Sequence, residues 1–182
     1  YNLSIAYSSK DLEDASILIL PGQGAASSCL DKLSSDFPDL KRNILNKPFL
    51  GICLVFQRVF NKAYEDGGVD CFSLIDGEVK DFRSAVHKGV KVPHMGWNKV
   101  KQKQNHILWK NIPDESFFYF VHSYYAQANN ELHVFSDTYY EINFTTSVMK
   151  ENIFACQFHP EKSSKYGLQL LSNFINWTEE LK

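Results

Sequence analysis

Long apolar runs, net charge and closely spaced cysteines are what this sequence has least of. No apolar stretch in its 182 residues approaches the ~18–20 residues that a membrane-spanning helix needs. The 19 lysines and arginines nearly balance the 21 aspartates and glutamates, which leaves no electrostatic footprint for nucleic acid or an anionic membrane. The four cysteines (Cys29, Cys53, Cys71 and Cys156) contain no CxxC pair, which argues against a disulfide framework and a zinc site.

Internal repeats, low-complexity tracts and linker-like segments are also missing. Apolar residues make up 44% of the chain and charged residues 22%, proportions that exclude a disordered or collagen-like protein. The length suits one compact domain, because natural domains commonly reach ~200 residues. We therefore expect a single domain over residues 1–182 and, since no signal-peptide pattern is present, a cytoplasmic protein.

Two short apolar runs, at 16–20 and 47–52, are typical of strands buried on both faces of a covered sheet. The first run ends at Pro21 and the second leads directly into Cys53. Residues 30–45 mix apolar and charged positions as one or two helices would, and the residues after Cys53 have the composition of a helix packed on a sheet. This alternation predicts an α/β fold with a mostly parallel sheet flanked by helices.

The middle of the chain is rich in β-branched and aromatic residues, which predicts an additional β region, antiparallel in character. Turn-forming pairs such as Asp76-Gly77 divide it into segments. The predicted strands are 73–82, 91–92, 117–121, 133–136, 141–146 and 153–158, and a closing helix is predicted at 166–178.

Cys53 lies where a buried strand is predicted to turn into a helix. Such a turn projects a side chain outward, and the positive end of the helix lowers a thiol pKa and favours the nucleophilic thiolate. A cysteine after an apolar strand is, taken alone, more often an inert core residue.

His159 is followed two residues later by Glu161. Residues two apart in extended backbone point to the same face, so this carboxylate can reach the imidazole, fix its tautomer and stabilise its protonated form. Taken alone, the pair also fits a surface histidine beside a surface glutamate.

The glycines of the segment 21–24 allow backbone N–H groups to approach a ligand, as an oxyanion hole requires. An ordinary turn explains the same segment equally well. The segment supports an oxyanion hole only in combination with the other motifs.

Five motifs, in order along the chain, resemble those of the class I, triad-type glutamine amidotransferases. They are Pro21-Gly22-Gln23-Gly24, Gly51-Ile52-Cys53-Leu54, Pro93-His94-Met95-Gly96-Trp97-Asn98, Tyr119-Phe120-Val121-His122-Ser123-Tyr124 and Phe158-His159-Pro160-Glu161-Lys162-Ser163-Ser164. The third and fourth narrow the resemblance to the glutaminase subunits of imidazole glycerol phosphate synthases. The resemblance runs from about residue 18 to residue 177, and it implies a flavodoxin-like sheet.

The resemblance implies a Cys-His-Glu triad that hydrolyses glutamine to glutamate and ammonia. Cys53 would attack the side-chain amide to give a glutamyl thioester, His159 would act as base and then as acid, and Glu161 would orient His159. No cofactor is implied. A metal site made of these three residues explains their sequence contexts less well.

The resemblance also assigns residues that hold the oxyanion and the substrate. The oxyanion donors would be backbone N–H groups around Gly22, Gln23, Gly24 and Leu54. The glutamine would be held by Gln57, Glu65 and Tyr124, with Glu65 pairing with the α-ammonium group.

A protein partner is implied as well, namely a (β/α)8-barrel cyclase that consumes the ammonia and makes imidazole glycerol phosphate and AICAR. The positions that match the partner-facing surface are Trp97, Asn98, Tyr119, His122, Ser123, Lys162 and Ser164. Tryptophan is enriched at interface hot spots, which favours an exposed Trp97, although a core position is the plain alternative.

Two departures from the family pattern stand out. Val55 occupies a position that is usually glycine in G-x-C-x-G, and its branched side chain is expected to crowd the turn. The family's opening strand and helix are absent, so we expect that the recorded chain begins about 20–25 residues late, from the usual length of one helix and one strand.

These departures leave alternatives open. A paralogous glutaminase that feeds a surface-sugar pathway, and a weakened or inactive subunit, both remain compatible with Val55. A third alternative is a hydrolase of γ-glutamyl substrates that acts without a partner.

Overall fold

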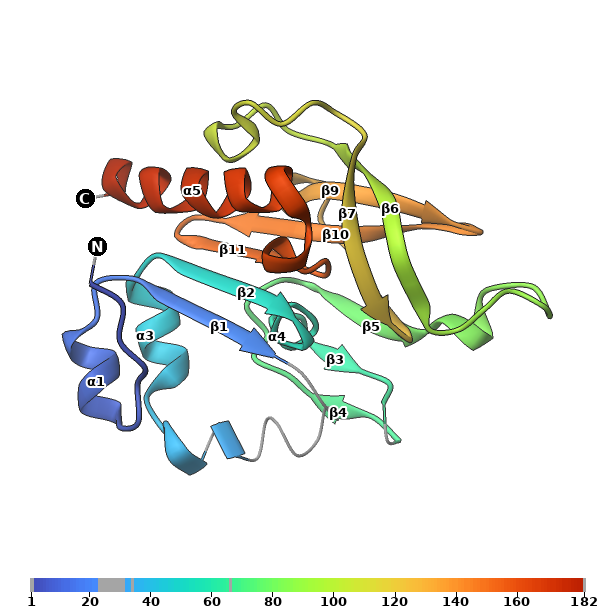
Figure 1. Cartoon of the computed structure of the whole chain (residues 1–182). Helices are drawn as coiled ribbons and strands as arrows, with labels where there is room; N and C mark the ends of the chain where they lie inside the picture. Colours follow the sequence, from blue (N-terminus) through green and yellow to red (C-terminus); the bar gives the residue numbers. More distant parts are fainter. Residues whose placement is uncertain (1, 23–31, 34, 66, 182) are drawn as a thin grey trace.

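The structure is a computed structural model that describes residues 2–22, 32–33, 35–65 and 67–181. Within these residues eleven strands form one mixed, curled sheet (Figure 1). The path through most of it is β1-β2-β11-β10-β8-β5-β3-β4, and β9 joins a β6–β7 hairpin to its side.

Three parallel strands form one end of the sheet, namely β1 (Leu18–Gly22), β2 (Phe49–Cys53) and β11 (Ile153–Cys156). Their register places Gly22 beside Cys53. Because parallel strands share a direction, their carboxyl ends, where ligands bind in open α/β sheets, lie at one edge.

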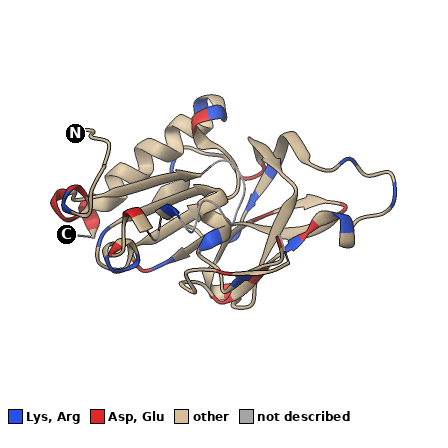
Figure 2. Cartoon of the chain, turned by 90° about the horizontal axis from the view of Figure 1, so that it is seen from below, with Lys and Arg blue, Asp and Glu red and all other residues tan. Residues whose placement is uncertain are grey.

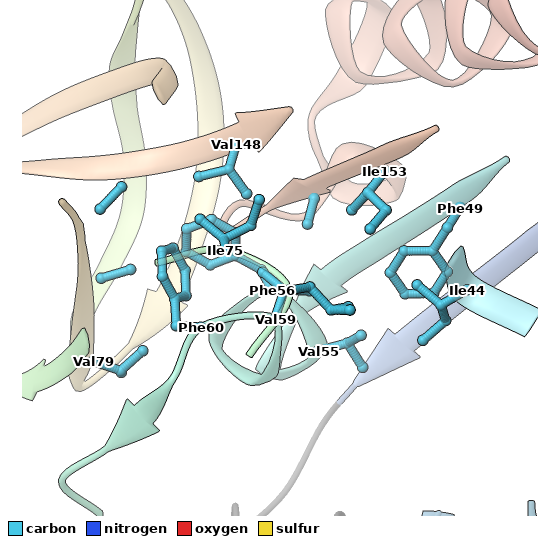
Figure 3. Close-up of a cluster of buried hydrophobic side chains, with 14 of the residues drawn as sticks. Ile44, Phe49, Val55, Phe56, Val59, Phe60, Ile75, Val79, Val148 and Ile153 are labelled. Atoms are coloured by element: carbon cyan, nitrogen blue, oxygen red, sulfur yellow. The ribbon is translucent and has the colours of Figure 1, made fainter. Parts of the chain in front are cut away.

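Helices cover both faces of these strands. The cluster on one face contains residues of α1 (Ser9–Asp14), α3 (Leu40–Asn46) and α4 (Leu54–Arg58), and the cluster on the other contains residues of α5 (Ser164–Glu180), as Figure 1 shows. Neighbouring residues of β2 divide between the clusters in the alternation of a strand: Phe49 joins the first, shown in Figure 3, and Leu50 joins the second. This double burial explains why the strand reads as a continuous apolar run.

The rest of the sheet is largely antiparallel. Its strands are β3 (Lys62–Ala63), β4 (Val69–Asp70), β5 (Gly77–Asp81), β6 (His94–Gln102), β7 (Ser116–His122), β8 (Tyr124–Ala128), β9 (Val134–Tyr140) and β10 (Ile142–Lys150). Only β3 and β5 pair in parallel among them. Four 3-10 helices lie at their ends and before α5, namely η1 (Phe82–Ser84), η2 (Ile107–Trp109), η3 (Glu131–His133) and η4 (Pro160–Lys162).

The predicted α/β class is confirmed, with a larger antiparallel share than the sequence indicated. The strand expected at 73–82 is limited to β5, and 91–92 is not a strand because pairing begins only at His94. The part of the predicted 30–45 helical region that falls on 30–31 and 34 lies outside the described residues.

No helix among the described residues is both long and apolar enough to cross a bilayer. Basic and acidic residues alternate along the ribbon in Figure 2 without gathering on one element.

Candidate active site

A cavity of about 500 Å³ opens at the carboxyl ends of β1, β2 and β11. Most residues assigned to glutamine chemistry from the sequence line it. They are Gly22, Cys53, Leu54, Gln57, Glu65, Tyr124 and His159. The structure thus brings together residues from elements that are far apart in the chain.

Cys53 is the last residue of β2 and immediately precedes α4. Its backbone has φ 55° and ψ −107°, a conformation that L residues rarely adopt and that concentrates at functional turns. This geometry is the strand-to-helix elbow expected from the sequence, and it turns Cys53 toward the cavity.

The expected crowding by Val55 is relieved by two glycines. A Cβ on Gly22 would lie 2.9 Å from Val55 Cγ2, and a Cβ on Gly51 would lie 3.1 Å from Val55 Cγ1. Val55 is fully buried in the cluster that contains Ile44 and Phe49 (Figure 3). The side chain of Val55 therefore fills space that is open because Gly22 and Gly51 have no side chains. The elbow still forms.

The expected lowering of the Cys53 pKa is wrong for the structure as it stands. Burial raises the pKa of the thiol to about 11, and the carboxylate of Glu161 adds to the rise. Hydrogen bonds from the backbone of Leu54 and the side chain of Gln157 offset only part of it. α4 has five residues, so its end supplies little positive charge, and the resting thiol is protonated at neutral pH.

Two glutamine side chains form a chain of hydrogen bonds that ends at this thiol. Gln57 Nε2 donates to the Tyr124 carbonyl (3.1 Å) and to Gln157 Oε1 (2.8 Å), and Gln157 Nε2 lies 3.7 Å from Cys53 Sγ. Since a carbonyl only accepts, the orientation of both amides is fixed, and Gln157 presents a donor to the sulfur. Both N–H groups of Gln57 are used in this chain, so its oxygen is the atom left to accept from a ligand.

His159 is oriented by Glu161. Its Nδ1 lies 2.8 Å from Glu161 Oε1, and because an ionised carboxylate only accepts, Nδ1 carries a proton. In the neutral ring the lone pair is then on Nε2, which is buried and has no hydrogen-bond partner within the described part of the chain. The cavity that His159 shares with Cys53 is where such an acceptor can find a proton.

The loop that carries His159 is held by the start of α5 and by β7. Ser163 Oγ donates to the His159 carbonyl (2.6 Å) and accepts from the Tyr119 amide (2.9 Å). On α5, Gly167 makes the close approach possible, because a Cβ there would lie 1.9 Å from the Pro160 carbonyl oxygen.

Glu65 reaches the cavity from the turn between β3 and β4. Its Oε2 is 3.1 Å from Nη2 of the fully buried Arg58. Of the oxyanion donors assigned from the sequence, Gly22 and Leu54 line the cavity, whereas Gln23 and Gly24 lie outside the described residues.

A second buried chain of hydrogen bonds includes His122, which lines the cavity. His122 Nδ1 donates to the Tyr124 carbonyl (2.7 Å), His122 Nε2 is 2.9 Å from His94 Nδ1, and His94 Nε2 is 3.2 Å from Asn98 Nδ2. Burial lowers the pKa of His94 to about 4 and that of His122 to about 3, where the neighbouring His94 lowers it further. Both rings are therefore neutral.

No group of three or more His, Cys, Asp or Glu side chains among the described residues could hold a metal ion. The geometry offers a buried thiol and a histidine on one cavity, with a carboxylate hydrogen-bonded to that histidine. Such a set suits nucleophilic chemistry on a carbonyl carbon.

Comparison with known proteins agrees with this geometry. Residues 2–177 match the family model described as glutamine amidotransferase class-I. The chain belongs to the class I glutamine amidotransferases. It is therefore an enzyme of the glutaminase type.

This amidotransferase has relatives with about 40% identity along most of its length. It is 40% identical to the imidazole glycerol phosphate synthase subunit HisH of Hydrogenovibrio crunogenus, over 96% of this chain and 83% of that one. It is 42% identical to subunit HisH 1 of Pseudomonas aeruginosa, over 91% and 80%.

Solved structures share the fold at lower identity. One is a glutamine amidotransferase of Thermotoga maritima (TM-score 0.60, 19% identity, 93% of this chain and 66% of that one). Another is the glutaminase domain of Trypanosoma brucei CTPS with bound acivicin (TM-score 0.60, 16% identity, 92% and 74%).

The residues of this chain that were predicted to contact a partner divide into two groups. Trp97 is 51% exposed on β6 and faces Tyr119 of β7 across the hairpin, with Asn98 partly buried beside it. Lys162 and Ser164 are exposed next to the His159 loop. Ser123 and the buried His122 line the cavity, and Lys162 reaches its rim as well, so these three residues belong to the site as much as to the outer face.

Gln157 and Arg58 were not identified from the sequence. Gln157 lies two residues before His159 at the end of a strand, where period-two spacing places both on one face. Arg58 follows Gln57, and a charged residue in an otherwise apolar helix is a signal of its own.

Proposed function

We propose that this chain is a single-domain glutaminase subunit that hydrolyses glutamine through Cys53, His159 and Glu161. It would pass ammonia to a (β/α)8-barrel cyclase that makes imidazole glycerol phosphate and AICAR in histidine biosynthesis. The observation that carries the proposal is the shared cavity, in which the Cys53 elbow meets a histidine whose Nε2 is an acceptor without a partner among the described residues. The similarity to HisH subunits supports the choice of partner.

The reaction follows from the protonation states. Cys53 gives its proton to His159 Nε2 as Sγ attacks the amide carbon, and Gly22 and Leu54, which line the cavity, would supply backbone N–H groups to the developing oxyanion. His159 then returns the proton to the amide nitrogen, the C–N bond breaks and ammonia leaves. Water, deprotonated by His159, attacks the thioester carbon, the C–S bond breaks, and His159 returns the proton to Sγ, which releases glutamate and restores the Cys53 thiol.

Burial raises the pKa of the Cys53 thiol to about 11, so the resting side chain is a thiol. Attack on the amide carbon therefore requires proton transfer from Cys53 to His159.

The test is glutamate release by the purified chain, alone and with a candidate barrel cyclase. We expect slow release alone and a large increase when the cyclase is added. Equal rates would indicate a solitary hydrolase, and no turnover in either sample would indicate a chain without activity. Acivicin, an amino acid with an electrophilic ring, is expected to label Cys53, which intact and peptide mass measurement can locate.

A further inference from the structure

Arg58 is a charged residue at a buried position whose neighbours are apolar. It belongs to α4, whose neighbours Val55, Phe56 and Val59 are fully buried, and its own side chain has no exposed surface. The guanidinium donates through Nη2 to Glu65 Oε2 (3.1 Å) and through Nη1 to Cys71 Sγ (3.3 Å). Its Nε is buried without a hydrogen-bond partner among the described residues.

Stability does not account for an arginine at this position. Removing a charge from water is costly, and an apolar side chain of similar volume usually serves a buried site at least as well as an ion pair. The Nε, which has no partner among the described residues, adds the cost of a desolvated donor. The charge of Arg58 is therefore explained better by its partner, Glu65, than by stability.

Glu65, the residue that Arg58 holds, lies on the wall of the cavity that contains Cys53. Its backbone is part of the turn that joins the two-residue strands β3 and β4, and its side chain is 19% exposed. A carboxylate on such a turn has several rotamers available. The planar guanidinium of Arg58, held in the core, restricts this freedom through its contact with Glu65 Oε2.

Charge balance points in the same direction. Free glutamine is a zwitterion with no net charge, and Arg58 with Glu65 is also neutral as a pair. Binding at the pair therefore adds no net charge to a partly buried cavity, whereas Glu65 alone would leave one uncompensated negative charge.

We propose that Arg58 is a positioning residue that holds the Glu65 carboxylate in the cavity wall to receive the α-ammonium group of the amino-acid substrate. The inference rests on the proposed function, because it takes glutamine as the ligand of Glu65. Arg58 itself is buried behind Glu65 and makes no contact with the cavity.

The test compares two reagents that label Cys53. Acivicin has an α-ammonium group and iodoacetamide has none, and peptide mass measurement counts the label on Cys53 alone. Arg58→Leu should slow labelling by subsaturating acivicin about tenfold, the usual effect of losing a charge-assisted hydrogen bond, and leave the iodoacetamide rate within about twofold. The KM for glutamine should rise by a similar factor, with a smaller change in kcat.

Two further variants separate positioning from folding. Arg83→Leu removes an exposed arginine that pairs with Asp81, and it should change neither rate. Glu65→Gln should lower stability because it leaves Arg58 buried and unpaired, and Arg58→Leu/Glu65→Gln should recover stability without recovering the preference for acivicin.

Parallel slowing of both reagents in Arg58→Leu, or unchanged labelling by acivicin, would overturn the inference. Failure of acivicin to label Cys53 in the wild-type chain would instead contradict the proposed function, and the inference with it. The wild-type sample therefore distinguishes the two failures.

Discussion

The Cys53 thiol receives hydrogen bonds from two donors, the Leu54 backbone and the Gln157 side chain. Gln157 is fully buried and its orientation is fixed through Gln57. A donor held in this way stabilises a thiolate more than a thiol, because hydrogen bonds to charged groups are the stronger ones. Gln157 thus connects a residue of the substrate-facing wall to the reacting sulfur.

Gln157→Leu is expected to raise the Cys53 pKa further and slow its alkylation. A hydrogen bond to a charged group contributes ~1.5–3 kcal/mol, so the iodoacetamide rate at pH 8 should fall about tenfold or more. The rate is read from Cys53 peptides over a pH series. Gln127→Leu, which changes an exposed glutamine paired with Lys80, is the matched control, and an unchanged pH profile in Gln157→Leu would contradict the role.

The sequence identified the residues of this site better than it predicted their burial and pKa. The motifs singled out Cys53, His159 and Glu161 as residues that belong together, and the structure places the first two on one cavity and pairs the last two. The thiol pKa was predicted in the wrong direction, because burial depends on elements that a local motif does not contain. Val55 likewise looked disruptive because Gly22, which makes room for it, is distant in sequence.

At the scale of elements, the contact between α5 and the His159 loop leaves no room for a larger side chain at Gly167. Gly167 is in the first turns of α5, and its missing side chain lets the helix approach the Pro160 carbonyl and Ser163. The position of His159 therefore depends on a glycine eight residues downstream.

Gly167→Ala is expected to lower the free energy of unfolding by about 1–3 kcal/mol, the usual effect of overpacking, and to reduce glutamine turnover more than labelling of Cys53. Urea denaturation and glutamate release are the measurements. Ser172→Ala, an exposed substitution on the same helix, should leave both unchanged. If Gly167→Ala behaved like Ser172→Ala, the close approach would not matter.

The pair of neutral histidines between β6 and β7 predicts sensitivity to acid. Their folded pKa values, about 4 for His94 and about 3 for His122, lie below the usual 6.5, so the unfolded chain binds protons first. The stability contributed by the neutral pair is present above pH 6.5 and is lost as the pH falls toward 4.

The free energy of unfolding in urea should therefore be about 4 kcal/mol lower at pH 5 than at pH 7, roughly 2 kcal/mol for each histidine. NMR of the imidazole rings should show His94 and His122 still neutral at pH 5. Protonated rings at pH 6, or a free energy of unfolding that does not change with pH, would contradict this assignment.

Element prediction succeeded where periodicity was strong. The buried runs that became β1, β2 and β11 and the helix α5 were identified, with shifted ends. β3 and β4 have two residues each, too few to show any period. β6 was missed because its first half contains Gly96 and Asn98, residue types that usually interrupt strands.

Over the whole molecule, the cavity and the proposed partner surface occupy adjoining regions. The cavity lies at the ends of the parallel strands, and β7 connects it to the hairpin with the exposed Trp97, because His122 at the end of β7 lines the cavity and Tyr119 pairs with Trp97. Sequence alone predicted the exposure of Trp97, and the motif order predicted the fold. That the two regions adjoin could be seen only in the three-dimensional structure.

In the proposed function, Cys53 releases the ammonia that a separate synthase consumes. The most direct measurement is synthesis by the complex with the barrel cyclase, driven either by glutamine or by added ammonia, with wild-type chain and with Cys53→Ala. We expect Cys53→Ala to abolish the glutamine-driven reaction and to leave the ammonia-driven reaction intact. Loss of both reactions, or persistence of the glutamine-driven one, would contradict it.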